Sequence, residues 1–219
     1  MLPIYTKWMT RRNLGILIGA SLPAMAQQKP DSFMQLPANL PVPLDDGACD
    51  HLPGMKIPSI ALRSTQGRMV NLAEPASGRI VVYVYPRTGA PGSTVPGTWD
   101  EIPGARGCTP QSCSMRDHYR EAKALGAEIL GLSTQTTEYQ KEVVERLHLP
   151  FEILSDVDFK FTHALNLPTF TFEGVTLDKR LTLVIKDGKI EKVFYPVFPP
   201  DKHGEQIVGW LKRKQGIAG

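Results

Sequence analysis

The amino-acid sequence predicts an α/β fold in which helices flank a central mixed sheet. Two observations carry this prediction. Strand and helix patterns alternate between residues 80 and 165, an order that builds parallel strands connected by helices. Two further strand patterns then surround a tight turn at Asp187-Gly188, and such a turn joins antiparallel strands. The length of 219 residues suits one domain with a sizeable core, and the composition is that of an ordinary globular chain.

The first strands are predicted ahead of this alternating region. Residues 60–62 and 69–72 are apolar segments around a turn that ends at Gly67, which indicates a hairpin. Residues 80–85 form a continuous β-branched and aromatic run whose two faces are both apolar, as in a buried central strand. Pro86 ends the run, because proline cannot donate a hydrogen bond to a strand ladder.

A long loop and the first helix follow the central strand. Residues 89–107 hold five glycines and three prolines, and a loop of this length usually serves function. Thr109 is a good N-cap and Pro110 suits the first helical position, so a helix is predicted to open there. Gly126 ends that helix. Its apolar stripe consists of Met115, Tyr119, Ala122 and Leu125.

The remaining elements continue the alternation and then close with a hairpin and a helix. They are, in chain order, a strand at 129–132, a helix at 139–147, a strand at 151–154, a short helix at 159–165, strands at 181–185 and 190–195, and a helix at 200–214. Together these elements make a thioredoxin-like plan, with a parallel core and antiparallel strands at one side.

The first 26 residues have the order of a secretory signal peptide. They contain three basic residues and no acidic one, then a short apolar run at 14–22, then the small-x-small sequence Ala24-Met25-Ala26. The pair Arg11-Arg12 also resembles a twin-arginine export signal. We therefore expect export to the periplasm, with an uncleaved N-terminal anchor as the alternative.

Removal of this leader changes the charge and defines three regions. The formal charge of +3 comes from the leader, which leaves 22 basic and 22 acidic residues. A neutral chain gives no electrostatic reason to bind nucleic acid or an anionic membrane, and no run of 18 apolar residues indicates a membrane span. The predicted regions are a signal peptide at 1–26, a proline-rich, extended lead-in without packed elements at 27–56, and the thioredoxin-like domain at 57–214.

The strongest chemical signal is the sequence Gly-Cys-Thr-Pro-Gln-Ser-Cys at 107–113. Cys108 lies where the long loop enters the predicted helix, and the free N–H groups and positive dipole end of a helix start favour a thiolate over a thiol. Arg106 adds a cation two residues before it. A thiolate is the nucleophilic form of cysteine, so Cys108 is predicted to be reactive.

Cys113 follows five residues later on the same predicted helix. In a regular helix this spacing separates the two Cα atoms by roughly 8.7 Å, beyond the limit of about 7 Å for a disulfide. The two thiols can bridge only if the first helical turn unwinds. The spacing therefore predicts a folded state with free thiols and an unwound state with a disulfide.

Other interpretations of the cysteines stay open. Cys108 and Cys113 could be inert buried thiols or a permanent structural disulfide. Together with His118 they could also be metal ligands, although the five-residue spacing from Cys113 to His118 rotates the histidine away from a common coordination point. Cys49, in the lead-in, is expected to be an exposed or loosely packed thiol or to pair between chains, without a catalytic role.

Further motifs accompany the cysteines. Tyr85-Pro86 precede them, the run Gly-Cys-Thr-x-x-x-Cys-x-x-Arg-Asp occupies 107–117, and Leu-Pro-Phe-x-x-Leu-Ser-Asp occupies 149–156. The set continues through Arg180 and the strand that follows it. It resembles the peroxiredoxin Q (bacterioferritin comigratory protein) branch of the peroxiredoxins, and the likeness spans residues 57–211.

This resemblance implies a thiol peroxidase for hydrogen peroxide or organic hydroperoxides that uses no metal or other cofactor. It makes Cys108 the peroxidatic cysteine, oxidised to a sulfenic acid, and Cys113 the resolving cysteine, which closes an intramolecular disulfide. Arg180 matches the family arginine that holds the thiolate and the peroxide oxygens. A thioredoxin-like or other thiol reductant is the implied partner, and both a monomer and a dimer are open.

One part of the family pattern is missing. Peroxiredoxins have Pro-x-x-x-Thr/Ser-x-x-Cys, but Ala105 stands three residues before Cys108, and an insertion within 89–107 separates the proline from the cysteine. The active-site hydroxyl is therefore unassigned. Trp99, in the insertion, is expected to cover the site or to dock a partner. The candidates for the hydroxyl are Thr88, Ser93 and Thr94.

Two rival functions use a similar fold. A general thiol–disulfide oxidoreductase prefers Cys-x-x-Cys, whereas four residues separate Cys108 from Cys113. A copper-handling protein similar to the SCO metallochaperones uses Cys-x-x-x-Cys with a distant histidine, and none of the five histidines recommends itself. Both are kept as alternatives to the peroxidase.

Overall fold

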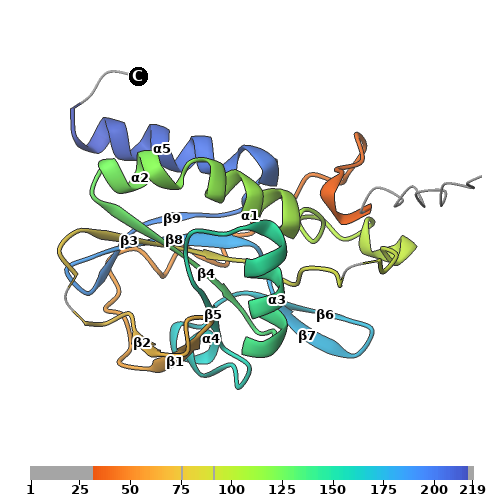
Figure 1. The fold of residues 1–219 in the computed structure, drawn as a ribbon, viewed down its shortest axis with the longest axis horizontal. Helices are drawn as coiled ribbons and strands as arrows, with labels where there is room; N and C mark the ends of the chain where they lie inside the picture. Colours follow the sequence, from red (N-terminus) through yellow and green to blue (C-terminus); the bar gives the residue numbers. More distant parts are fainter. Residues whose placement is uncertain (1–31, 75, 91, 217–219) are drawn as a thin grey trace, which may run out of the picture.

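The computed structural model describes residues 32–74, 76–90 and 92–216, so the predicted signal peptide and the first residues of the lead-in lie outside it. Within these ranges one seven-stranded sheet has the order β2-β1-β5-β4-β3-β8-β9 (Figure 1). Its strands are β1 (Ala61–Ser64), β2 (Met69–Asn71), β3 (Arg79–Val84), β4 (Ala127–Ser133), β5 (Ile153–Ser155), β8 (Leu181–Lys186) and β9 (Lys189–Phe194).

The sheet is mixed, as the sequence predicts. β3, β4 and β5 run parallel, and β8 and β9 add the predicted antiparallel strands at one side. The prediction of antiparallel strands at one side only is wrong, because the β1–β2 hairpin pairs antiparallel with β5 at the other side. β3 lies between β4 and β8, and its side chains alternate between two cores. Val81 and Tyr83 point into one core, and Val82 and Val84 into the other. This alternation confirms the prediction of a buried central strand.

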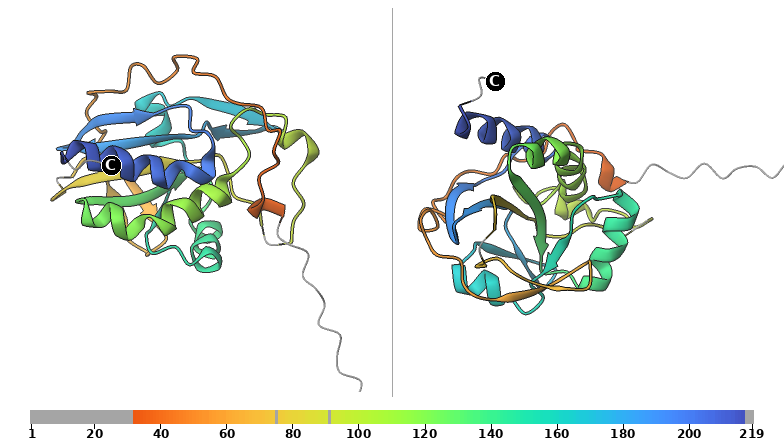
Figure 2. Two further views of the ribbon diagram at one scale, coloured as in Figure 1. Left: turned by 90° about the horizontal axis from the view of Figure 1, so that it is seen from above. Right: turned by 60° about the vertical axis from the view of Figure 1, so that its left-hand side comes forward.

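Helices cover both faces of this sheet (Figures 1 and 2). α1, α2, α3 and α5 share one core, which contains Met115, Val143 and Ile207, whereas α4 and the lead-in contribute to the opposite core. No helix in the described ranges is long and apolar enough to cross a bilayer. The helices are α1 (Cys108–Asp117), α2 (Tyr119–Ala124), α3 (Thr137–Leu147), α4 (Lys160–Leu165) and α5 (His203–Lys214), with short turns η1 (Ser32–Met34), η2 (Gly97–Trp99) and η3 (Pro200–Lys202).

The helix after the long loop differs from the prediction in two ways. It begins one or two residues early, at Cys108, because Gly107 opens it in a left-handed conformation, with φ of 101°, and no side chain caps it. It also breaks at His118, where the start of α5 lies against the turn: Gly204 N donates to Ser114 Oγ at 3.0 Å. The predicted apolar stripe still faces the core along α1 and α2.

The sequence prediction misses a second sheet. β6 (Thr169–Phe172) and β7 (Val175–Asp178) pair antiparallel around Glu173-Gly174, and both turn residues have positive φ. Alternating apolar residues around such a two-residue turn are the signal of a hairpin, and the sequence contains them. The hairpin matters for function because Arg180 and β8 follow it directly.

The prediction of an unpacked lead-in is wrong for the part that the structure describes. Residues 32–56 contain little regular structure, yet Leu52 is fully buried and Cys49 is 5% exposed, both in the core on the α4 side of the sheet. His51 Nε2 lies 2.9 Å from the carbonyl oxygen of Leu165 at the end of α4. Prolines interrupt regular helices and strands here, but they do not prevent the burial of apolar side chains.

Candidate active site

Cys108 lies in the first turn of α1, directly after the left-handed Gly107. The residue is 4% exposed, and its Sγ lies 3.7 Å from the carbonyl oxygen of Ala105. A side chain at position 107 would overlap Pro200, so the loop enters the helix at this angle only with a glycine. Cys108 therefore lies at the positive end of the helix dipole, as the sequence analysis expects.

Arg180 lies beside Cys108, although 72 residues separate the two in the chain. Its Nη2 is 3.2 Å from the cysteine Sγ, and the arginine is 3% exposed. The same guanidinium donates to the side-chain oxygen of Gln111. It also donates at 3.0–3.1 Å to three consecutive carbonyl oxygens, those of Gly104, Ala105 and Arg106.

This arrangement places a buried, permanent cation against one sulfur atom. A cation at hydrogen-bond distance stabilises a thiolate more than a thiol, and it also stabilises negative charge that develops on a departing oxygen. The additional contacts hold the planar guanidinium in one orientation. The fold thus brings together Cys108 and Arg180, two of the three residues that the sequence analysis singles out.

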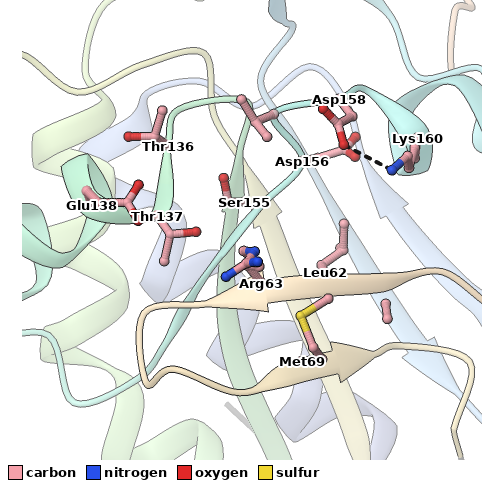
Figure 3. Close-up of a pocket in the computed structure, with 12 residues that line it drawn as sticks. Leu62, Arg63, Met69, Thr136, Thr137, Glu138, Ser155, Asp156, Asp158 and Lys160 are labelled. Atoms are coloured by element: carbon pink, nitrogen blue, oxygen red, sulfur yellow. Dashed lines mark hydrogen bonds and ion pairs between the residues drawn. The ribbon is translucent and has the colours of Figure 1, made fainter.

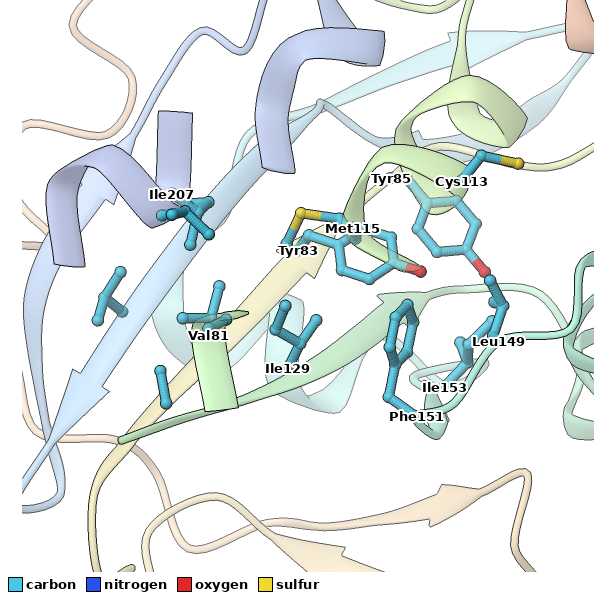
Figure 4. Close-up of a cluster of buried hydrophobic side chains, with 14 of the residues drawn as sticks. Val81, Tyr83, Tyr85, Cys113, Met115, Ile129, Leu149, Phe151, Ile153 and Ile207 are labelled. Atoms are coloured by element: carbon cyan, nitrogen blue, oxygen red, sulfur yellow. The ribbon is translucent and has the colours of Figure 1, made fainter. Parts of the chain in front are cut away.

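Cys113, the third of these residues, lies on the same helix and is 9% exposed. It borders the apolar cluster that contains the Tyr83 and Tyr85 rings (Figure 4). Burial raises the pKa of its thiol, while nearby Arg116 partly opposes this effect. Both thiols are free. Because both belong to α1, helix geometry separates their Cα atoms by roughly 8.7 Å, too far for a disulfide.

Three buried polar atoms near Cys108 have no hydrogen-bond partner among the described residues: the Thr109 hydroxyl, the Gln111 amide nitrogen and the Tyr85 hydroxyl. Leaving such an atom unpaired costs about 1–3 kcal/mol, so a small polar molecule that pairs with it gains that energy. Sequence reasoning missed all three. The available signal was the cysteine motif itself, in which Thr109 and Gln111 stand between the two cysteines.

None of the three candidate hydroxyls is a hydrogen-bond partner of the Cys108 sulfur, whose partners are Ala105 and Arg180. Thr88 is buried, but its hydroxyl donates to Gln135 Oε1 at 3.2 Å. Ser93 and Thr94 are exposed, and the Ser93 hydroxyl donates to a carbonyl oxygen of its own turn at 2.7 Å. Instead, the backbone of Ala105, at the position of the family hydroxyl, faces Arg180 through its carbonyl oxygen.

Trp99 anchors the inserted loop to the β6–β7 hairpin. Its ring is 3% exposed, meets Phe172 edge-on with 4.9 Å between centroids, and lies 6.0 Å from Phe170. The Arg87 guanidinium lies 4.6 Å from the Trp99 centroid, in cation–π geometry. The expectation that Trp99 docks a partner is wrong, because its ring is already buried. It holds in place the loop whose carbonyl oxygens, at 104–106, orient Arg180.

The geometry gives little support to metal binding by the cysteines or to an exposed Cys49. Within the described ranges, no group of three or more His, Cys, Asp or Glu side chains is arranged to hold a metal ion. His118 directs Nδ1 to the Ser114 carbonyl oxygen, 2.9 Å away. Cys49 is neither exposed nor loosely packed, contrary to expectation. Burial, with a smaller contribution from Asp46, raises its pKa to about 12, so its thiol stays protonated and unreactive.

One cavity adjoins the site and another does not. A mostly apolar cavity of about 400 Å³ lies between the lead-in, the inserted loop and the segments just before β8 and just after β9, and Arg180 lines it together with Val42 and Ile102. A cavity of about 360 Å³ lies between the β1–β2 hairpin and the starts of α3 and α4 (Figure 3). Arg63 and Asp156 line this second cavity, and none of the three predicted site residues does.

Comparison with known sequences agrees with this geometry. The redoxin family model matches residues 52–207. The chloroplastic peroxiredoxin Q of Sedum lineare is 33% identical over 160 residues, which cover 73% of this chain and 77% of that protein. Peroxiredoxin Bcp of Escherichia coli is 33% identical over 159 residues, which cover 71% of this chain and 92% of that protein.

Comparison with solved structures confirms the thioredoxin-like fold. Peroxidoxin BcpB from Mycobacterium tuberculosis superposes with a TM-score of 0.60 at 23% identity, over 74% of this chain and 98% of that one. A mutant of PrxQ from Xylella fastidiosa superposes with a TM-score of 0.62 at 18% identity, over 75% of this chain and 98% of that one.

Proposed function

Because the chain belongs to the redoxin family and, within it, to the peroxiredoxin Q/Bcp branch, we propose that Cys108, Cys113 and Arg180 form its peroxidase site. The protein is a thiol-dependent peroxidase, which reduces a peroxide with electrons from a thioredoxin-like or other thiol reductant. The contact of 3.2 Å between Arg180 Nη2 and Cys108 Sγ carries the assignment of the residues. These relatives give no support to a copper-handling or general disulfide-exchange function.

The first half-reaction takes place at Cys108. Its thiolate attacks the terminal oxygen of a hydroperoxide, the O–O bond breaks, and one oxygen stays on sulfur as a sulfenic acid. The other oxygen leaves with the electron pair of the O–O bond and takes up a proton, which gives water or an alcohol. Arg180 stabilises both the thiolate and the negative charge on the leaving oxygen. The unpaired Gln111 amide and Thr109 hydroxyl are further donors for the peroxide.

The second half-reaction joins the two cysteines. The Cys113 sulfur attacks the sulfur of the sulfenic acid, an S–S bond forms, and water leaves. The first turn of α1 must unwind for this step, because intact helix geometry keeps the sulfurs apart. An external dithiol then returns two electrons and two protons and restores both thiols. None of these steps uses a metal or a prosthetic group.

Single-turnover oxidation tests this proposal. The reduced protein without residues 1–26, its Cys108→Ser variant and its Cys113→Ser variant each receive one equivalent of hydrogen peroxide. Intact mass and sulfenic-acid trapping are then measured. We expect a disulfide in the wild type, no reaction in Cys108→Ser, and a trapped sulfenic acid in Cys113→Ser. Equal, slow oxidation of all three proteins would contradict the assignment and favour disulfide exchange or copper binding.

We further propose that the protein is exported to the periplasm, which the sequence of residues 1–26 and its small-x-small pattern ending at Ala26 support. In this compartment the reductant is an exported thiol protein. The neutral charge of the remaining chain supports neither a nucleic-acid nor a membrane partner. Cell fractionation with N-terminal sequencing tests export, and the native mass of the purified protein distinguishes a monomer from a dimer.

A further inference from the structure

A segment of the lead-in lies against the reactive end of α1. We call residues 33–36 the strap. η1 (Ser32–Met34), which overlaps the first two residues of the strap, contacts α1 (Figure 1). Two strap side chains pack directly against glycines that have no side chain to obstruct them. A Cβ on Gly89 would overlap the Phe33 ring, and a Cβ on Gly107 would approach Leu36. The strap ends well before residue 52, where the redoxin match begins, so it lies outside the part of the chain shared with the family model.

Arg106 ties the strap to the site. Its Nη2 donates to the Gln35 carbonyl oxygen at 3.0 Å, its Nη1 donates to Asp100 Oδ1 at 3.1 Å, and its guanidinium lies 5.7 Å from the centroid of the Phe33 ring. The residue is 7% exposed, so these contacts are largely shielded from water. The Arg106 carbonyl oxygen in turn accepts a hydrogen bond from Arg180 at 3.1 Å.

The position of these contacts couples them to the second half-reaction. Arg106 is two residues before Cys108, and Gly107 between them is the residue on which the helix opens. Cys108 cannot approach Cys113 without unwinding of this turn, and such unwinding displaces Arg106 and Gly107. The Gln35 and Asp100 hydrogen bonds and the Leu36 contact therefore oppose unwinding, whereas none of them touches the reacting sulfur.

We propose that Arg106 and the strap hold the first turn of α1 closed and thereby set the fate of the Cys108 sulfenic acid. This inference rests on the proposed function. The closed turn delays attack by Cys113. During the delay a second hydroperoxide can be reduced by the sulfenic acid, which becomes a sulfinic acid while the peroxide leaves as water or an alcohol. Arg106 thus acts on disulfide formation indirectly, by holding in place the turn that must unwind.

Two variants release the strap by independent routes. Arg106→Gln removes the charged donor that joins Gln35 to Asp100. Gly89→Ala displaces the Phe33 ring and leaves the sequence of α1 and Arg106 unaltered. The backbone of Gly89 is not in the left-handed region, so alanine can adopt it. Met34→Ala is the matched control, because this strap side chain is 45% exposed. Circular dichroism and melting temperature establish that each variant is folded.

The main measurement is the ratio of sulfinic acid to disulfide at Cys108, determined by intact mass over a series of peroxide concentrations. The rate at which peroxide oxidises the Cys108 thiol to the sulfenic acid is measured in parallel. We expect Arg106→Gln to need about tenfold more peroxide for half conversion to sulfinic acid, since loss of a charge-assisted hydrogen bond shifts an equilibrium by about that factor. Gly89→Ala should shift the half-conversion point in the same direction. In Gly89→Ala, whose substitution lies outside the peroxidase site, the rate of Cys108 oxidation by peroxide should change less than threefold, and Met34→Ala should match the wild type. Arg106→Lys, which keeps the charge, should give an intermediate ratio.

Two outcomes separate this inference from the function on which it rests. Suppose that the wild type forms a disulfide and that the two released variants are folded. If their ratios of sulfinic acid to disulfide then lie within twofold of the wild-type ratio, the strap does not control disulfide formation with Cys113. If the wild type forms neither sulfenic acid nor disulfide at Cys108, the assignment of the peroxidase site itself is wrong. A change of the Cys108 oxidation rate in Gly89→Ala that parallels the change of the ratio would also overturn the inference, because the strap would then act on peroxide access.

Discussion

Replacement of Arg180 by lysine perturbs the most connected side chain of the site. Lysine keeps a positive charge, but its compact head cannot contact the Cys108 sulfur, Gln111 and three carbonyl oxygens at once. Two full charges 3.2 Å apart interact by roughly 5 kcal/mol at an effective dielectric constant of about 20. The guanidinium charge is spread over three nitrogens, and lysine retains part of the attraction. We therefore expect a loss of about 3 kcal/mol, or roughly 100-fold in rate.

The assay is the second-order rate constant for single-turnover oxidation of Cys108 by hydrogen peroxide at pH 7. Arg87→Lys is the matched control, since Arg87 stacks on the Trp99 ring in the same region. It should stay within threefold of the wild type. Gln111→Met, which keeps the side-chain volume and removes one acceptor from Arg180, should lose about tenfold. A folded Arg180→Lys protein that reacts within threefold of the wild type would refute the electrostatic role of Arg180.

Three further predictions concern the elements that support the site. Gly107→Ala should destabilise the protein by at least about 1–2 kcal/mol and slow peroxide oxidation, because position 107 has positive φ and its Cβ would overlap Pro200; an unchanged melting temperature would contradict this. Trp99→Ala should cost about 3 kcal/mol in urea unfolding and open the inserted loop to proteases, and equal proteolysis of both proteins would count against the anchoring role. Burial raises the pKa of Asp178 to about 7, well above the ordinary aspartate value of 3.8, so its ionisation opposes folding. Its contribution to stability is fully present below about pH 4 and is lost as the pH rises to 7. Asp178→Asn should therefore be more stable than the wild type above pH 7, by up to roughly 4 kcal/mol, with the difference vanishing near pH 4 in denaturant titrations.

The central elements could be predicted because their signals are local. The run around β3 is apolar on both faces and β-branched, and only a buried strand satisfies that pattern. The cysteine motif is equally local, since a helix start determines where Cys108 lies. Arg180 could be predicted as a site residue only from the family resemblance, because no local sequence signal connects it to a cysteine 72 residues away.

The parts that the sequence analysis misjudged depend on contacts between distant segments. The proline-rich lead-in has no periodicity, and Leu52 becomes buried because α4 and the sheet leave a space that it fills. The break at His118 arises where Gly204 of α5 meets Ser114, a contact that no window of sequence contains. The β6–β7 hairpin is the exception: its signal was local, and the alternation around Glu173-Gly174 indicates it.

The alanine at position 105 shows how a site can lose a motif residue and keep its geometry. Arg180 is oriented by the carbonyl oxygens of 104–106, and every residue type supplies a carbonyl. The Ala105 side chain, 1% exposed, belongs instead to the apolar cluster of Trp99 and Phe172. A threonine here would place a hydroxyl among these apolar groups, and without a partner it would cost about 1–3 kcal/mol. Packing of the inserted loop therefore selects a small apolar side chain at 105, while the backbone of the same residue orients Arg180.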